Sequence, residues 1–162
     1  MTLKKAQEVI DLLGLTPLPV EGGYFKSTYR SPATVNSSAG SRDLMSCIYY
    51  LLTPTCRSLM HRLKADEIFH FYAGDPVEML LLFADGQGRT VTLGPDLGAG
   101  QIPQLTVPAG VWQGARLVAS GEFALMGTTV APGFVFEDFE LGERAALIEE
   151  YPALETEIVN LT

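Results

Sequence analysis

Short apolar runs alternate with turn residues along most of this 162-residue chain, and this rhythm limits the folds open to it. About nine runs have the length and composition of β-strands, and glycine-containing turns at 85–88 and 120–121 are typical of hairpins. The predicted strands cover residues 21–30, 44–52, 58–63, 67–73, 77–84, 89–93, 104–107, 113–119 and 122–131. Many short strands at regular spacing favour an all-β sandwich or barrel, here one domain over residues 1–162.

The two ends of the chain have a helical pattern instead. Leu3, Ala6, Ile10 and Leu13 recur at helical spacing and Gly14 provides a stop signal. A second helical pattern covers residues 143–150 and restarts after Pro152. Residues 32–41 are rich in Ser, Ala, Asn and Gly without periodicity, which predicts a mobile loop. The sequence leaves open whether this loop closes over a binding site as a lid.

The charge balance excludes some classes of partner. The formal net charge is -8 and the isoelectric point is about 4.7, which argues against binding to nucleic acid or to an anionic membrane. A small anionic ligand remains compatible, because a few arginines in a pocket suffice to bind it. The two cysteines give no sign of a disulfide framework, although a single disulfide stays open, and the N-terminus lacks the features of a signal peptide. We therefore expect a cytoplasmic protein.

One segment, residues 60–75, concentrates the groups that can do chemistry. It contains both histidines of the chain, His61 and His70, and an acid, Glu67, that the strand pattern predicts to be buried. The segment lies between two apolar strand-like runs. A chemical site is therefore predicted here.

The spacing within this segment resembles the first motif of the cupin superfamily, which is His-x-His, three or four residues, Glu, six residues and Gly. The matching positions are His61, Leu63, Glu67 and Gly74. A second cupin motif, Pro-x-Gly, two residues and His, is matched at Pro108 and Gly110. Leucine thus replaces the second motif histidine, and Gln113 stands in place of the third.

Motifs along almost the whole chain resemble an uncharacterised branch of the cupins. They are Glu-Gly-Gly-Tyr-Phe at 21–25, His-Arg at 61–62, Asp-Glu at 66–67, His-Phe-Tyr-Ala-Gly-Asp at 70–75 and Pro-Ala-Gly-Val-Trp-Gln at 108–113. The resemblance implies a cupin jelly-roll β-barrel with short N- and C-terminal helices, similar to the deoxysugar 3,5-epimerases, and a homodimer. It implies a pocket but no particular reaction.

A cupin metal is normally held by three histidines and one glutamate, so the resemblance points to His61, Glu67 and Gln113. An imidazole and a carboxylate are good ligands for zinc, iron or manganese, whereas a neutral amide is poor and leucine is none. His70 follows Glu67 by three residues, which places it on the opposite face of a regular strand. We predict no cofactor, and a divalent metal at the first three residues stays as an alternative.

Metal-free proton transfer is the second kind of chemistry that these residues support. His61 and Glu67 on neighbouring strands would shift each other's pKa toward neutrality in an apolar cavity. A histidine base facing a tyrosine acid suits proton abstraction next to a carbonyl, as the resemblance to the epimerases implies. We choose Tyr49 as the acid, with Tyr24 and Tyr72 as the other phenols. The alternative is that His61 and Glu67 are only a buried hydrogen-bonded pair.

The predicted ligand is a small polar or anionic metabolite. Its binding residues are predicted to be Tyr24, Arg30, Arg62, Gln113, Trp112 and His70. Either arginine can clamp a carboxylate or phosphate, or form a salt bridge to one of the nineteen acids. The indole can stack on a planar ligand or close the barrel mouth, and His70 also fits a core or interface position. The functional hypotheses are a metal-independent sugar or sugar-nucleotide isomerase or epimerase, a non-catalytic binding module, and a metal-dependent enzyme.

Overall fold

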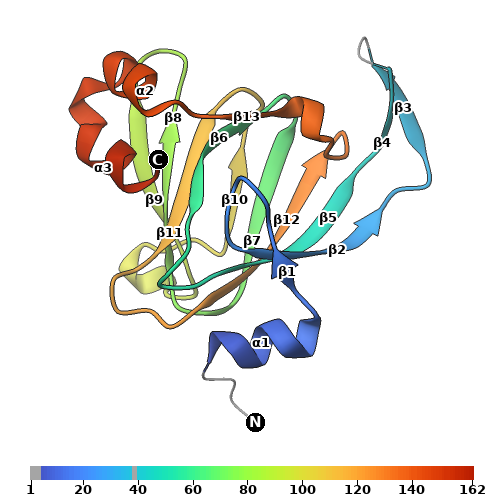
Figure 1. Cartoon of the computed structure of the whole chain (residues 1–162), viewed down its shortest axis with the longest axis horizontal. Helices are drawn as coiled ribbons and strands as arrows, with labels where there is room; N and C mark the ends of the chain where they lie inside the picture. The colour runs from blue at the N-terminus through green and yellow to red at the C-terminus, as the bar shows by residue number, and fades with distance from the viewer. Residues whose placement is uncertain (1–4, 38–39) are drawn as a thin grey trace.

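Two antiparallel β-sheets face each other in the computed structural model, which describes residues 5–37 and 40–162 (Figure 1). The six-stranded sheet has the order β1-β2-β5-β12-β7-β10 and the five-stranded sheet has the order β13-β6-β11-β8-β9. Strands from both halves of the chain interleave in each sheet, as jelly rolls require. The predicted all-β jelly roll is therefore confirmed, although among the described residues no strand ladder joins the two sheets into a closed barrel.

The strand bounds follow the sequence pattern closely. The six-stranded sheet contains β1 (Thr16–Pro17), β2 (Tyr24–Arg30), β5 (Ser46–Leu52), β12 (Ala124–Ala131), β7 (Asp66–Gly74) and β10 (Gln104–Val107). The five-stranded sheet contains β13 (Phe139–Leu141), β6 (Ser58–Leu63), β11 (Trp112–Leu117), β8 (Val77–Leu82) and β9 (Gly88–Leu93). Each of the nine predicted strands is present, with its ends shifted by a few residues at most.

Helices cover the ends and one outer face of the sandwich. They are α1 (Ala6–Leu13), α2 (Arg144–Glu150) and α3 (Glu155–Asn160), with 3-10 turns at Leu97–Ala99, Phe136–Asp138 and Pro152–Leu154. Gly14 ends α1 in the left-handed conformation, with φ at 63°, as its stop signal predicted. The C-terminal helices pack on the five-stranded sheet through Leu147, Ile158 and Leu161. Within the described residues, no helix has the length and apolarity needed to cross a membrane.

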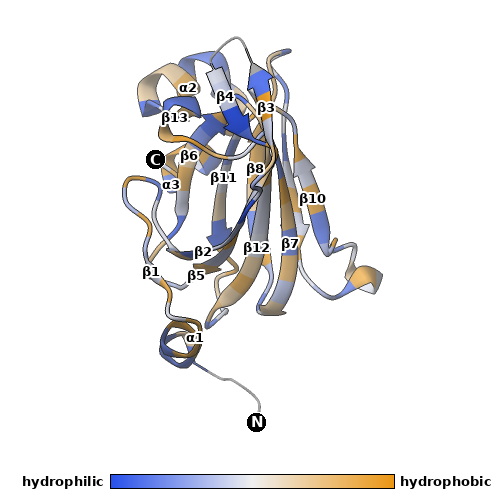
Figure 2. Ribbon diagram, turned by 90° about the vertical axis from the view of Figure 1, so that its right-hand side faces the viewer, coloured by the Kyte–Doolittle hydropathy of each residue, from blue (hydrophilic) through white to orange (hydrophobic). Residues whose placement is uncertain are grey.

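The main core lies between the two sheets. Alternate residues of each strand point inward, because successive side chains of a strand lie on opposite faces. On β5 the inward residues are Ile48, Tyr50 and Leu52, whereas Tyr49 and Leu51 pack on the outer face beside α1. Figure 2 shows the corresponding alternation of hydrophilic and hydrophobic residues along β10. Face assignment by alternation therefore decides which side chains can reach a cavity between the sheets.

The prediction of a structureless loop at residues 32–41 is wrong. Two short strands, β3 (Thr34–Ser37) and β4 (Gly40–Asp43), pair in an antiparallel hairpin, and residues 38–39 lie outside the described chain. The hairpin projects from the end of the molecule opposite α1 (Figures 1 and 2). It pairs mostly polar residues away from the main core, so no apolar periodicity marks it in the sequence. The structure supplies no evidence that it acts as a lid.

Candidate functional site

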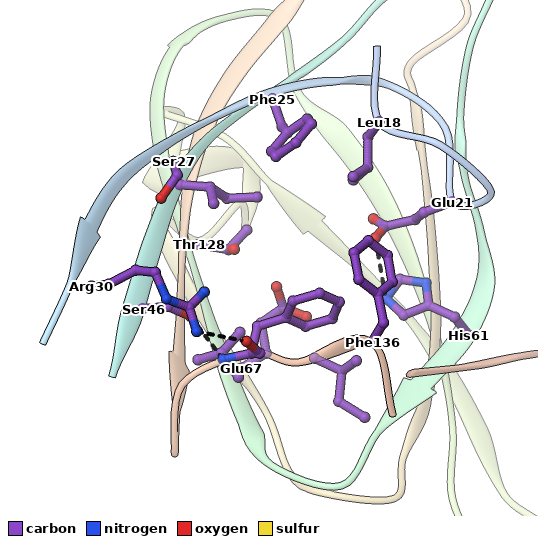
Figure 3. Close-up of a pocket in the computed structure, with 14 residues that line it drawn as sticks. Leu18, Glu21, Phe25, Ser27, Arg30, Ser46, His61, Glu67, Thr128 and Phe136 are labelled. Carbon is purple, nitrogen blue, oxygen red and sulfur yellow. Dashed lines mark hydrogen bonds and ion pairs between the residues drawn. The ribbon is translucent and has the colours of Figure 1, made fainter. Parts of the chain in front are cut away.

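A cavity of about 200 Å³ opens between the two sheets at the end where β2, β5 and β6 meet the segment after β12 (Figure 3). Its wall combines apolar side chains with a small number of ionisable ones. The lining residues are Leu18, Glu21, Phe25, Ser27, Arg30, Ser46, Ile48, His61, Leu63, Glu67, Thr128, Val130, Phe134 and Phe136. Three predicted site residues are thus brought together here, namely His61, Glu67 and Arg30.

His61 lies on β6 and is only 2% exposed. Its Nδ1 is 2.7 Å from the carbonyl oxygen of Leu59, so we assign the ring hydrogen to Nδ1, which donates to that oxygen. The other nitrogen, Nε2, lies 4.0 Å from the Glu21 carboxylate. The ring also stacks on Phe139, with centroids 5.1 Å apart. In this tautomer Nε2 has a lone pair with which it can accept a proton.

Glu21 is a site residue that the sequence reasoning missed. Its carboxylate lines the cavity, where it accepts a hydrogen bond of 2.8 Å from the Ser58 hydroxyl. It belongs to the Glu-Gly-Gly-Tyr-Phe motif, which was interpreted as part of a predicted strand and of the family resemblance, without a chemical role for the acid. An acid directly before two glycines was the available signal, because glycines often shape a loop around a functional group.

The backbone around Glu21 holds an unusual shape. Val20 has a φ of 69°, in the left-handed region that β-branched residues rarely adopt. Gly22 has a φ of 99°, and a Cβ there would lie 2.3 Å from the carbonyl oxygen of Arg57. The Tyr50 hydroxyl donates a 2.9 Å hydrogen bond to the Gly22 carbonyl. This close packing fixes the position from which the Glu21 carboxylate enters the cavity.

Glu67 lies on β7 and is almost fully buried. The Gln113 side-chain amide donates a hydrogen bond of 2.8 Å to its Oε2. The pKa of Glu67 is raised from its ordinary 4.5 to about 7, mainly by burial and then by the nearby Glu21 charge, while His61, Gln113 and Thr128 act in the opposite direction. Glu67 therefore holds a proton near neutral pH, which suits a group that gives a proton and takes it back.

Gln113 does not line the cavity but contacts Glu67, which does. It is 1% exposed, and it pairs in register with His61 across β11 and β6. Its Nε2 faces Glu67, and its Oε1 has no hydrogen-bond partner within the described part of the chain. The predicted role in ligand binding becomes a role in holding the Glu67 carboxyl in place.

Arg30 lies at the opposite side of the cavity from His61 and Glu21 (Figure 3). Its Nε donates 2.8 Å to Asp43 and its Nη2 donates 3.0 Å to the carbonyl of Phe134. Regular alternation of side chains along β2 would place Arg30 on the same face as Tyr24, opposite Phe25. A β-bulge between Ser27 and Tyr29 shifts the register and turns the guanidinium onto the cavity face.

Three predicted residues of the six-stranded sheet lie outside the cavity. Tyr24 and Tyr49 pack beside α1 on the outer face, and Tyr49 contacts the ring of Tyr72 edge to face at 6.2 Å. His70 stacks on Tyr72 with centroids 6.5 Å apart, and it is offset from Glu67 by an odd number of strand positions. The described residues that line the cavity therefore include Glu67 but no tyrosine.

Arg62 and Trp112 lie on the outer face of the five-stranded sheet. The indole packs among the residues that hold the C-terminal helices, including Leu147 and Ile158. The Arg62 guanidinium lies 4.4 Å from the centre of this indole ring and makes two hydrogen bonds, of 2.8 and 3.0 Å, to Glu140. Their alternation with His61 and Gln113 on β6 and β11 explains why they face away from the cavity.

The donor set does not fit the metal site that the cupin resemblance implies. Leu63 places an apolar side chain in the cavity wall where a second histidine would stand, and Gln113 turns an N–H donor toward Glu67. Among residues 5–37 and 40–162, no three His, Cys, Asp or Glu side chains are grouped closely enough to hold a metal ion. We therefore derive no chemical step through a metal.

Comparison with known proteins gives one family match. The family model described as Cupin superfamily (DUF985) matches residues 7–142. An uncharacterized protein of Saccharomyces cerevisiae is 35% identical over 132 residues, an alignment that covers 73% of this chain and 66% of the yeast protein. The chain thus spans slightly less than two thirds of the length of that relative.

Solved structures give the same result for the fold. A hypothetical protein from Leishmania major matches with a TM-score of 0.91 and 33% identity over 98% of this chain and 99% of that one. The protein SO0799 from Shewanella oneidensis matches with a TM-score of 0.90 and 39% identity over 99% and 98%. Oxalate decarboxylase of Bacillus subtilis matches with a TM-score of 0.55 and 14% identity over 91% of this chain and 37% of that one, which is a likeness of fold alone.

Proposed function

The chain belongs to the DUF985 family of the cupin superfamily, and on this premise we propose that its cavity binds a small polar or anionic metabolite and isomerises it without a metal. The observation that carries the proposal is that a proton acceptor and a proton donor face one cavity from opposing sheets, His61 from β6 and Glu67 from β7, rather than from the neighbouring strands that the sequence suggested. His61 presents Nε2, and Glu67 holds a proton near pH 7. General acid catalysis works best when the pKa of the proton donor lies near the working pH.

The proposed step moves two protons and breaks one C–H bond. His61 Nε2 takes a proton from the carbon next to a carbonyl group, and the electron pair of the C–H bond forms a C=C double bond. Glu67 gives its proton to the carbonyl oxygen, so that a neutral enol forms. Glu21, 4.0 Å from Nε2, stabilises the imidazolium that results. Return of a proton to the other face of the same carbon, with the enol O–H proton going back to Glu67, completes an epimerisation. Where that carbon carries a hydroxyl group, protonation of the former carbonyl carbon and loss of the proton of that hydroxyl to Glu67 completes an isomerisation.

Two substrate classes are consistent with this step. The resemblance to the deoxysugar 3,5-epimerases favours a sugar or a sugar nucleotide. This argument rests only on similarity of fold. Arg30 and the apolar wall favour a small carbonyl acid instead. Arginine is well suited to either, because its planar guanidinium binds carboxylate and phosphate groups with two parallel hydrogen bonds.

Two other functions use the same cavity. A binding module would keep the ligand and catalyse no exchange, with His61 and Glu67 as anchoring groups. A metal-dependent enzyme would require an ion at His61, Glu67 and Gln113, where the amide nitrogen rather than the oxygen faces the carboxyl group. The homodimer implied by the family resemblance remains a prediction.

Solvent deuterium exchange tests the proposed function. Chelator-treated protein is incubated in D₂O with sugar phosphates, oxo-sugar nucleotides and 2-oxo acids, and proton NMR follows the signal of the hydrogen on the carbon next to the carbonyl. We expect exchange above background for one class, at a rate unchanged by added zinc, manganese or iron. Exchange that appears only with a metal would favour the metal-dependent enzyme, and ligand binding without exchange would favour the binding module.

A further inference from the structure

The wall of the cavity is more apolar than a sugar requires. Half of the lining residues are aliphatic or aromatic, namely Leu18, Phe25, Ile48, Leu63, Val130, Phe134 and Phe136. A sugar ring carries hydroxyl groups around its edge, and each needs a new hydrogen-bond partner when it leaves water. An apolar wall cannot supply these partners, but it does stabilise an apolar side group by excluding water from it.

Several polar groups of the wall already have hydrogen-bond partners within the protein. Glu67 accepts from Gln113, and Glu21 accepts from the Ser58 hydroxyl. The Ser46 hydroxyl accepts from the backbone N–H of Phe134. Of the other hydroxyl groups on the described part of the wall, that of Thr128 is hydrogen-bonded to Glu67, which leaves that of Ser27 to a ligand with many hydroxyl groups. The His61 Nε2, the proton of Glu67 and the guanidinium of Arg30 together suit a ligand with one carbonyl and one anionic group.

The size of the cavity gives an independent limit. Pockets that enclose drug-sized ligands have volumes of roughly 300–1,000 Å³, and this one has about 200 Å³. A nucleotide-linked sugar would leave most of its atoms outside. A compact acid with a branched or aromatic side group would be enclosed.

The charged groups lie at separate ends of this small space. Figure 3 shows Arg30 on one side of the cavity and Glu21 with His61 on the other, with Glu67 between them and Phe25 and Leu18 across from it. The hydrogen bonds of Arg30 to Asp43 and to the Phe134 carbonyl use two of the five N–H groups of its guanidinium. Resting on the proposed function, we infer that the substrate is a small carbonyl acid with an apolar side group, its carboxylate at Arg30 and its carbonyl between His61 and Glu67.

Binding of matched probes tests this inference. The probes are 4-methyl-2-oxopentanoate, its methyl ester and UDP-glucose, and calorimetry measures their affinities. Loss of a charge-assisted hydrogen-bond pair typically lowers affinity about 10- to 100-fold. We expect the acid to bind more tightly than the ester by about this factor, and Arg30→Met to abolish the difference.

Arg116→Met is the matched control for the arginine variant. Arg116 also pairs with an acid, at 2.8 Å from Glu78, and its side chain is 46% exposed against 48% for Arg30, but it does not line the cavity. Surface ion pairs of this kind contribute little to stability, so both variants should fold. We expect the control to bind the acid as the unmodified protein does.

The outcomes separate this inference from the proposed function. Equal affinity for acid and ester, or tighter binding of UDP-glucose than of the acid, would overturn the substrate class. Deuterium exchange in a sugar that carries a carbonyl group, without exchange in the acid, would also overturn it and leave the proton-transfer function intact. Arg30-dependent binding of the acid without exchange would support the ligand class and contradict the proposed reaction.

Discussion

Replacing Glu67 with glutamine is expected to lower the rate of deuterium exchange by about 10²–10⁴-fold, which is the usual contribution of a positioned acid or base. Glutamine has nearly the same shape and keeps an oxygen that can accept the hydrogen bond from Gln113. Its amide group is not acidic, so it cannot transfer a proton to the substrate at any working pH. A residual rate equal to that of the unmodified protein would contradict the assignment of Glu67 as the proton donor.

The same substitution is expected to stabilise the fold at high pH. The pKa of Glu67 is about 7 in the folded protein and about 4.5 when unfolded, so the folded state binds the extra proton between these values. Stability is therefore lost as the pH rises from 4.5 through 7. Each pKa unit corresponds to about 1.4 kcal/mol, so Glu67→Gln should gain about 3 kcal/mol relative to the unmodified protein at pH 8 and almost nothing at pH 4.

Urea unfolding at a series of pH values measures this difference. Glu122→Gln is the control, because Glu122 is exposed and its carboxylate stays in water. Its free energy of unfolding should differ from that of the unmodified protein by a constant small amount. Parallel stability curves for Glu67→Gln and the unmodified protein would show that the Glu67 carboxyl has no raised pKa.

Truncation of Trp112 to alanine is expected to reduce the free energy of unfolding by about 3–5 kcal/mol, as is typical for a buried tryptophan. The indole is 8% exposed and packs with the residues that attach α2 and α3 to the five-stranded sheet. Its removal also deprives the Arg62 guanidinium of the ring that lies 4.4 Å away. Urea unfolding measures the loss, which is a large part of the 5–15 kcal/mol of a typical domain.

The milder variant Trp112→Phe separates a structural role from a role in binding. It keeps an aromatic ring in the same cluster, so we expect a smaller loss of stability and a folded protein. Because the indole lies on the face opposite the cavity, ligand affinity should equal that of the unmodified protein. A tenfold weaker affinity with unchanged stability would restore the ligand-stacking role that the sequence left open.

The strands were predictable because side-chain alternation and turn residues are local signals. The chemical segment was predictable for the same reason, and His61 and Glu67 do lie on one cavity. The β3–β4 hairpin was missed because it buries no apolar face, and periodicity detects only strands that do. Local patterns thus find the elements that build the core and miss those that extend beyond it.

The positions of the remaining site residues could not be predicted, because they depend on structural features that a sequence pattern does not encode. A single bulge in β2 moves Arg30 to the cavity face, and a shift of one residue exchanges the two faces of a strand. Tyr49 and Trp112 lie one position away from the inward side chains of their strands. Glu21 reaches the cavity from a loop, where no periodicity applies.

The central claim is that Glu67 holds a proton near neutral pH beside a histidine that can accept one. Carbon-13 NMR of the glutamate side-chain carboxyl groups, recorded from pH 3 to 9, tests this without a substrate. Comparison with Glu67→Gln assigns the resonance. The account predicts that this carboxyl titrates with an apparent pKa of about 7. Titration near the ordinary value of 4.5 would contradict the claim and leave Glu67 as a structural or ligand-anchoring carboxylate.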